Sequence, residues 1–225
     1  MESRSPYTSD CEFRASFCAQ EFVPDGDLNK PAWQKALRVA FDHDWMGQRH
    51  YPGCSTQVAS LWTPSHYYFA FWCKYIELNL YAGDDPTLEK FGLWDRDVAE
   101  VFLNPFPERV NRYFEFEVAP NNQWIDLEVN LDADPSFDEK WDSRFLHATR
   151  IDAGQHLWTC EMRIPAAAMG APPIRAGAEC RVNFYRCDGP GDDTQRRFLA
   201  WSPTLCTNPS DYFHVPTRFG KVLFD

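Results

Sequence analysis

The sequence of 225 residues contains no apolar run approaching ~18–20 residues, the length that a membrane-spanning helix requires. Positive charge is also scarce, because 22 lysines and arginines stand against 33 aspartates and glutamates, for a net charge of −11. A surface of that sign repels phosphate backbones and anionic lipid headgroups. We therefore expect neither nucleic acid nor a membrane as a partner.

None of the eight cysteines forms a Cys-x-x-Cys pair, which argues against a zinc ribbon or a thioredoxin-type site. The first residues, MESRSPYTSDCEF, lack the apolar segment of a secretory signal. As written, the sequence predicts a cytoplasmic chain with reduced and mostly buried thiols. A leader removed from the chain would instead make the protein secreted and favour disulfides.

The sequence also lacks Gly-x-Ser-x-Gly, His-Glu-x-x-His and a phosphate-binding loop, so three common catalytic motifs are missing. It has no internal repeat and no low-complexity linker that would separate two halves. Residues 1–225 are therefore predicted to form a single domain.

Aromatic residues are abundant, at 16% of the chain, and they concentrate in short runs between prolines and glycines. Such runs, separated by turn signals, are typical of strands in a sandwich or barrel. The predicted strands are Ala15–Val23, Leu37–Phe41, Thr56–Trp62, Tyr67–Lys74, Val98–Leu103, Tyr113–Val118, Trp124–Val129, Ala148–Ile151, Leu157–Ile164, Glu179–Arg186, Arg197–Trp201 and Lys221–Phe224. Helix signals are confined to Asn29–Leu37 and Pro165–Gly170.

Several of these runs alternate with a period of two residues. In Tyr113–Val118, Phe114, Phe116 and Val118 share one face, while Tyr113, Glu115 and Glu117 share the other. One face then packs and the other meets water or a ligand, as in antiparallel sheets. The predicted fold class is an all-β antiparallel β-sandwich, of jelly-roll or immunoglobulin-like type, with one or two short helices.

The segment FGLWDRDVAEVFLNP places an aromatic residue and several charged residues at the entrance of a core strand. Trp94, Arg96 and Asp97 precede the strand, and Glu100 lies within it. Aromatic rings stack on the C–H face of a sugar, and carboxylates and arginine bind its hydroxyls. These four residues are therefore candidates for a sugar site, or else for a turn cap and an ordinary ion pair.

Five segments together resemble the family 9-like carbohydrate-binding modules. VPDGDLNKPAWQKA is similar to the family's opening motif DG.lde..W..A, and LWDRDVAEVFLNP to its W..D.vEvf.dp segment. WTCEMRIP matches w.vE..Ip, RVNFYRCD matches g.nf.r.d, and FHVPTRFGKVLF resembles the closing P..FG.l.f. The segments follow the family's order and span nearly the whole chain.

The resemblance implies a non-catalytic β-sandwich that binds a sugar or a glycan chain end, such as one of xylan or cellulose, between two tryptophans. It implies that Trp94 takes the place of the first tryptophan, with Arg96, Asp97 and Glu100 where hydrogen-bonding groups lie. Phe213, beside Tyr212 and His214, falls in the place of the second tryptophan, and Glu117 falls in the place of an arginine. The predicted ligand-binding residues are Trp94, Arg96, Asp97, Glu100, Glu117, Tyr212 and Phe213.

Calcium is the cofactor that the resemblance suggests, since some family members hold it in loops. Asp84 and Asp85 are the candidate ligands, in a stretch that does not follow the EF-hand pattern. The alternative is a solvated acidic turn.

Two other functions remain open from the sequence. A small glycoside hydrolase needs two carboxyl groups ~5–9.5 Å apart, and the pairs Asp126 and Glu128, or Glu115 and Glu117, fit strand spacing. The other is a haem-binding or protein-interaction β-sandwich, in which Met46 with His43 or His50 would be the axial ligands of a haem.

Overall fold

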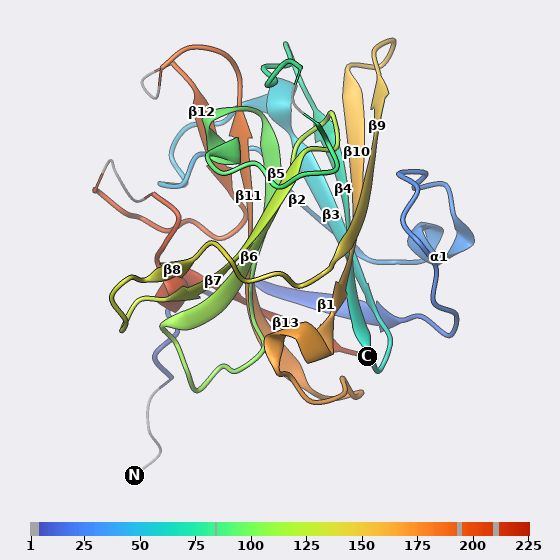
Figure 1. Cartoon of the computed structure of the whole chain (residues 1–225), viewed down its shortest axis with the longest axis vertical. Helices are drawn as coiled ribbons and strands as arrows, with labels where there is room; N and C mark the ends of the chain where they lie inside the picture. Colours follow the sequence, from blue (N-terminus) through green and yellow to red (C-terminus); the bar gives the residue numbers. More distant parts are fainter. Residues whose placement is uncertain (1–4, 84, 193–194, 209–211) are drawn as a thin grey trace.

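Two β-sheets enclose one hydrophobic core in the computed structural model, which describes residues 5–83, 85–192, 195–208 and 212–225 (Figure 1). The fold is all-β and of the β-sandwich class predicted from the sequence. Its strands are β1 Glu12–Phe17, β2 Arg38–Phe41, β3 Thr56–Trp62, β4 His66–Lys74, β5 Val98–Asn104, β6 Arg112–Val118, β7 Trp124–Asn130, β8 Phe137–Asp138, β9 Leu146–Asp152, β10 Leu157–Pro165, β11 Glu179–Asp188, β12 Arg197–Ala200 and β13 Gly220–Phe224.

Strand β1 belongs to both sheets. The first sheet has the order β8-β7-β6-β5-β11-β13-β1, and β12 also pairs with β11. The second has the order β1-β3-β4-β10-β9, with β2 added on β3. All pairings are antiparallel except those of β1, which runs parallel to β13 and to β3. β1 therefore joins the two layers at one corner of the sandwich.

The helices are short: α1 spans Pro31–Gln34, and single turns of 3-10 helix span Pro52–Cys54, Leu93–Asp95, Ala166–Met169 and Pro216–Arg218. No helix in the described part of the chain is both long enough and apolar enough to cross a membrane.

The predicted alternation of strand faces is confirmed. Phe114, Phe116 and Val118 of β6 pack into the core between the sheets, together with residues of β3, β4, β10 and β11. Tyr113 of the same strand packs into a second apolar cluster, on the outer face of the first sheet. Because Glu115 and Glu117 alternate with the core residues, they lie on that outer face.

Two local predictions differ from the structure. The strand expected at Ala15–Val23 is instead Glu12–Phe17, because the chain leaves the sheet after Phe17 and Phe22 packs as a loop residue against Trp33 and Tyr68. The helix expected over Asn29–Leu37 is a single turn at Pro31–Gln34. The two-residue strand β8 carries too little pattern to be predicted.

The loop that leads to α1 is fastened to β10 by one buried carboxylate, that of Glu161. The indole N–H of Trp33 donates to Glu161 Oε1 over 2.6 Å, and Lys30 Nζ lies 2.6 Å from Oε2. The backbone N–H groups of Asp25 and Gly26 donate to Oε2 over 2.9 and 3.2 Å. One side chain of β10 thus satisfies four donors from residues 25–33.

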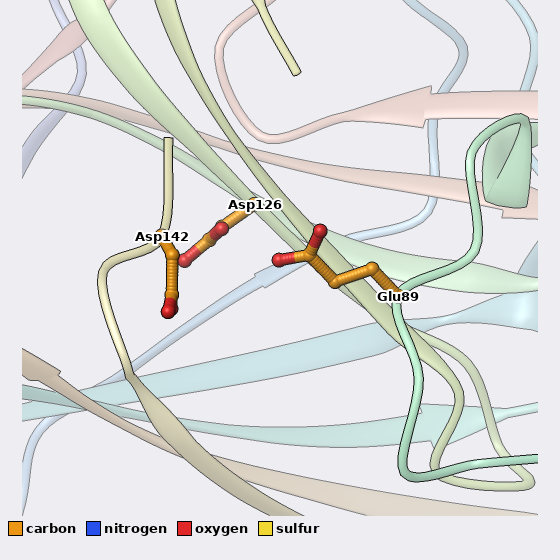
Figure 2. A group of neighbouring side chains, drawn as sticks. All are labelled: Glu89, Asp126 and Asp142. Atoms are coloured by element: carbon orange, nitrogen blue, oxygen red, sulfur yellow. The ribbon is translucent and has the colours of Figure 1, made fainter. Parts of the chain in front are cut away.

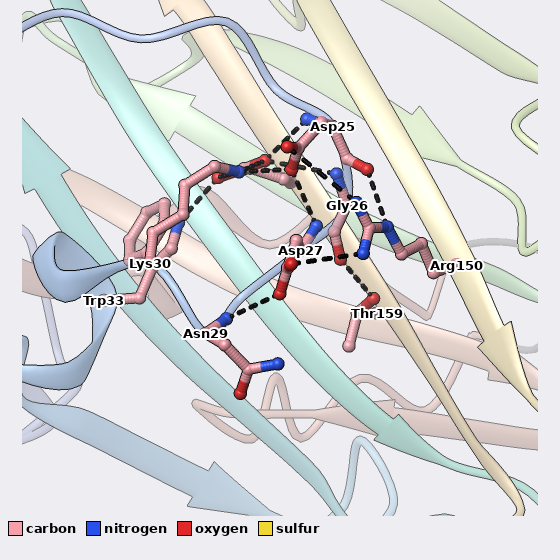
Figure 3. Close-up of polar contacts among 9 residues, drawn as sticks. Asp25, Gly26, Asp27, Asn29, Lys30, Trp33, Arg150 and Thr159 are labelled. Carbon is pink, nitrogen blue, oxygen red and sulfur yellow. Dashed lines mark hydrogen bonds and ion pairs between the residues drawn. The ribbon is translucent and has the colours of Figure 1, made fainter.

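Gly26 is required by the same arrangement. Its φ is +75°, and an added Cβ would lie 2.9 Å from Arg150 Cγ and from the carbonyl carbon of Thr149. The carbonyl oxygen of Gly26 also accepts a hydrogen bond from Thr159 Oγ1 over 2.8 Å (Figure 3). A side chain here would force apart the loop and the sheet.

Candidate functional site

A cavity of about 660 Å³ lies on the outer face of the first sheet. Its floor is formed by side chains of β5, β6, β7 and β11, and its walls by loops that precede β5 and β13. The lining residues among those described are Phe91, Trp94, Asp95, Glu100, Phe102, Glu115, Glu117, Leu127, Leu131, Ser136, Phe137, Glu139, Cys187, Arg196, Phe198, Asn208, Tyr212, Phe213 and His214. A cavity of this size admits a sugar unit or a short oligosaccharide.

Trp94 stands in the wall of this cavity on a 3-10 turn, η2 (Leu93–Asp95). The turn begins after Gly92, whose φ is +78°, and Leu93 anchors it in the outer apolar cluster. Arg196 Nη2 donates to the backbone carbonyl oxygens of Trp94, over 2.7 Å, and of Arg96, over 2.8 Å. Trp94 is half-buried, and Phe91 packs edge-on against its ring with centroids 4.9 Å apart. The indole is therefore held in a fixed position at the cavity wall.

Asp97 and Arg96, both predicted to bind ligand, do not line the cavity. Asp97 is fully buried and accepts hydrogen bonds from the backbone N–H groups of Asn79, over 3.0 Å, and Gly189, over 2.7 Å. The Arg96 guanidinium lies 4.4 Å from the centre of the Tyr81 ring. Both residues therefore support the loops around Trp94.

Glu100 and Glu117 lie at the floor of the cavity, together with Glu115. Glu100 is directly opposite Glu117 in the β5–β6 register, and Glu115 is opposite Phe102. The three side chains are 1%, 1% and 3% exposed, respectively, and one oxygen from each lies within 4.8 Å of the others. The alternation in β6 already placed Glu115 beside Glu117, but the sequence-based set of site residues included only Glu117.

The electrostatics of this floor are unusual. Burial and then the charge of Glu115 raise the pKa of Glu100 to about 8. Burial and the charges of Glu100 and Glu115 raise the pKa of Glu117 well above its ordinary value. Glu100 and Glu117 therefore retain protons at neutral pH, and a protonated carboxyl can donate a hydrogen bond as well as accept one.

The stability of the fold is expected to decrease with rising pH because of Glu100. Its pKa is raised in the folded state, so the folded chain holds a proton that the unfolded chain releases above about pH 4.3. The resulting stabilisation is lost as pH rises toward about 8. Relative to the wild type, Glu100→Gln should gain about 3–4 kcal/mol in free energy of unfolding between pH 5 and pH 8.

Urea unfolding of the two proteins at both pH values measures this difference directly. The comparison cancels the opposing contribution of His147 and His214, whose burial lowers each pKa to about 4. Glu108→Gln, at an exposed position outside the cavity, is the matched control. If the free energy of unfolding depended on pH equally in Glu100→Gln and the wild type, the raised pKa of buried Glu100 would be contradicted.

Tyr212 and Phe213 form the opposite part of the aromatic lining. Tyr212 stacks on Trp45 with ring centroids 4.0 Å apart, and Phe213 stacks on Tyr185 at 4.1 Å with an interplanar angle of 12°. Phe213 is only 8% exposed, so much of its ring faces protein. Arg196 also lines the cavity and was missed from the sequence, because it follows a loop with no recognisable strand pattern.

The carboxylate pair Asp126 and Glu128 lies outside this cavity. Glu128 is paired with Arg112 over 2.7 Å, and Asp126 accepts a hydrogen bond from the backbone N–H of Ser143 over 3.0 Å. Glu115 and Glu117 do line the cavity, but their nearest oxygens lie within 4.8 Å, closer than the ~5–9.5 Å that flanks a glycosidic bond.

The histidines of the haem alternative are engaged in a hairpin before β3. His43 and His50 form a β-bridge, and His50 Nδ1 lies 2.8 Å from Asp42 Oδ1. His43 Nδ1 lies 3.3 Å from the carbonyl oxygen of Asp44. Their nearest contacts are thus within the hairpin itself.

Of the two aspartates proposed as calcium ligands, Asp84 lies outside the described residues. Asp85 is exposed and accepts hydrogen bonds from the backbone N–H and the hydroxyl of Thr87, over 2.9 and 2.7 Å. That geometry is a turn cap.

Glu89, Asp126 and Asp142 form a second carboxylate cluster (Figure 2). This cluster fits a cation that prefers oxygen ligands better than Asp85 does. One oxygen of each lies within 4.8 Å of the others, and buried Asp126 Oδ1 has no hydrogen-bond partner among the described residues. The three residues come from distant segments, so sequence spacing gave no signal for them.

A surface cavity lined by aromatic rings and polar groups suits a small polar ligand such as a sugar. Residues 24–225 match the family model described as "Carbohydrate family 9 binding domain-like". The chain belongs to this family, as its sequence motifs predicted. Modules of the family are non-catalytic carbohydrate-binding domains.

Solved structures with this fold include a candidate carbohydrate-binding protein from Bacteroides uniformis, with a TM-score of 0.73 and 18% identity, covering 95% of this chain and 99% of that one. A family 9 module from Caldicellulosiruptor kristjanssonii in complex with cellotriose matches with a TM-score of 0.64 and 16% identity, over 96% and 94% of the two chains. The same organism's family 9 module in complex with glucose gives 0.65 and 17%, over 96% of each chain.

A curated relative, named "Extracellular protein", comes from Arthroderma benhamiae. It is 27% identical over 147 residues, which are 59% of this chain and 62% of that protein.

Proposed function

We propose that this chain is a non-catalytic module that binds a sugar or a glycan chain end in the cavity on the outer face of the first sheet. The ring of the sugar stacks on Trp94, and its hydroxyl groups meet Glu100, Glu115 and Glu117. The observation that carries the proposal is the meeting of a fixed half-buried indole and three buried carboxyl groups in one cavity of about 660 Å³.

The solved family 9 structures with glucose and cellotriose support a β-1,4-linked glucan or a similar chain, such as xylan, as the ligand. The name of the fungal relative supports a site of action outside the cell, in place of the cytoplasmic location that the sequence alone favours.

The eight cysteines are all free thiols in the structure, and six of them are buried.

Isothermal titration with glucose, cellotriose and xylotriose tests the proposal. Trp94→Ala should weaken binding by roughly 10–100-fold, because the central aromatic residue of a binding site commonly contributes 2 kcal/mol or more. Trp72→Ala is the matched control, since Trp72 is also half-buried but lies on β4, outside the cavity.

If Trp94→Ala kept its affinity and Trp72→Ala lost it, the sugar-binding site would be assigned to the second sheet. Shorter products appearing from cellotriose during the titration would contradict binding without turnover.

A further inference from the structure

The cavity is lined by more acidic side chains than a neutral sugar requires. Among the described lining residues five are acidic, namely Asp95, Glu100, Glu115, Glu117 and Glu139, whereas Arg196 is the one lysine or arginine. His214 adds no positive charge, because burial lowers its pKa to about 4. The Arg196 Nη2 atom already donates to two backbone carbonyl oxygens of the wall.

Glu117 has unused hydrogen-bonding capacity. Both of its carboxyl oxygens are buried, and the neighbouring carboxyl of Glu115 is their one hydrogen-bonding neighbour among the described residues. Its side chain is 1% exposed and contributes to the cavity lining. Buried carboxyl oxygens in native proteins are normally paired, so this side chain marks a position that a ligand can fill.

Among the described residues, no lysine or arginine forms a hydrogen bond with the carboxyl oxygens of Glu117. Glu100 lies opposite on β5, and its Oε1 accepts a hydrogen bond from the Cys187 thiol over 3.1 Å. Arg186 is on the other face of β11, where it pairs with Asp188 over 2.8 Å. The charged and titratable groups around Glu117 are therefore Glu100, Glu115, Asp95, Cys187 and Arg196.

We propose that this cavity prefers a sugar that carries an amino group over the neutral sugar of the same shape. Such a ligand is a hexosamine, or the end of an N-acetylhexosamine chain that has been deacetylated. The inference rests on the proposed function, because it assigns the ligand class of the same site. An ammonium group brings three N–H donors and a positive charge to the three carboxyl groups. The aromatic lining adds cation–π attraction and a stacking surface for the ring.

Binding of the ammonium group is expected to release protons. Glu100 and Glu117 hold protons because they are buried and because they lie close to each other and to Glu115, and a positive charge beside them favours their ionised forms. Protonated carboxyls still bind a neutral sugar through its hydroxyls. An amino sugar therefore differs from glucose both in affinity and in the number of protons released.

The test is isothermal titration with glucosamine, N-acetylglucosamine and glucose at pH 6.5 in buffers of different ionisation enthalpy, with EDTA present. Glucosamine should bind at least tenfold more tightly than glucose, with proton release that glucose does not show. N-acetylglucosamine, which has the same ring but no charge, should not share the gain. Glu117→Gln should remove the preference, so that glucosamine and glucose bind the variant with equal affinity, and Glu108→Gln should keep the preference of the wild type.

Equal affinity for glucosamine and glucose in the wild type would overturn the inference and leave the proposed function intact. A glucosamine preference that survives in Glu117→Gln would overturn the assignment to this floor. If binding of all three sugars required added Ca²⁺ in place of EDTA, the cation at the floor would be a metal, and the inference would fail. Absence of binding by every sugar under all conditions would reject the proposed function itself.

Discussion

Replacing Glu161 with leucine should destabilise the fold by about 3–5 kcal/mol, because three N–H donors lose their acceptor and each buried donor left unsatisfied costs about 1–3 kcal/mol. Glu161 is fully buried and accepts hydrogen bonds from the Trp33 indole, the Lys30 ammonium and two backbone N–H groups. In the variant, Lys30 still pairs with Asp25, whereas the indole and the two backbone N–H groups lose their acceptor. Urea unfolding followed by tryptophan fluorescence measures the loss.

Glu108→Leu provides the matched control, because the same substitution at an exposed position removes no buried acceptor. Glu161→Gln should fall between the wild type and the leucine variant, since an amide oxygen still accepts from some of the donors. If Glu161→Leu lost less than 1 kcal/mol, the loop of residues 25–33 would not depend on this carboxylate.

The second large effect is expected at Asp188, in the core between the sheets. Its carboxylate is fully buried and accepts from Arg186 Nη2 over 2.8 Å and from Arg197 Nε over 2.7 Å. Asp188→Leu leaves the fully buried Arg186 without this partner and should cost about 3–5 kcal/mol. Thermal and urea unfolding monitor the change.

The double variant Asp188→Leu with Arg186→Leu separates charge from packing. Replacement of both members of a buried ion pair by apolar residues is commonly close to neutral, so the double variant should recover most of the loss. If it were instead less stable than the single variant, the loss in Asp188→Leu would arise from packing.

Strand positions could be predicted from the sequence where a run rich in aromatic and β-branched residues lies between turn signals. Thr56–Trp62 was predicted with its observed limits, and the faces of Tyr113–Val118 were also correct. The prediction failed around Phe17, where the chain leaves the sheet although apolar residues continue as far as Val23. Pattern shows that a segment can form a strand, but the available partner decides where the strand ends.

Part of the cavity could likewise be predicted from the sequence. The predicted residues Trp94, Glu100, Glu117, Tyr212 and Phe213 all line it. Their grouping requires the β5–β6 register and the approach of the loop before β13, which no local pattern specifies. Whether they bind a ligand stays a prediction.

The remaining predicted residues, Arg96 and Asp97, show the limit of local reasoning. They neighbour Trp94 in sequence, but a turn sends successive side chains in different directions. Asp97 therefore points to the backbone N–H groups of Asn79 and Gly189, and Arg96 to Tyr81. Arg196, which comes from a distant segment, reaches the cavity instead.

The corner strand β1 also affects how the domain can be shortened for expression. The family match begins at residue 24, after β1 has ended at Phe17. A chain trimmed to that boundary would expose the backbone donors and acceptors of both β13 and β3. Two uncovered sheet edges side by side invite self-association, so soluble production of the isolated module depends on retaining the residues ahead of the family boundary.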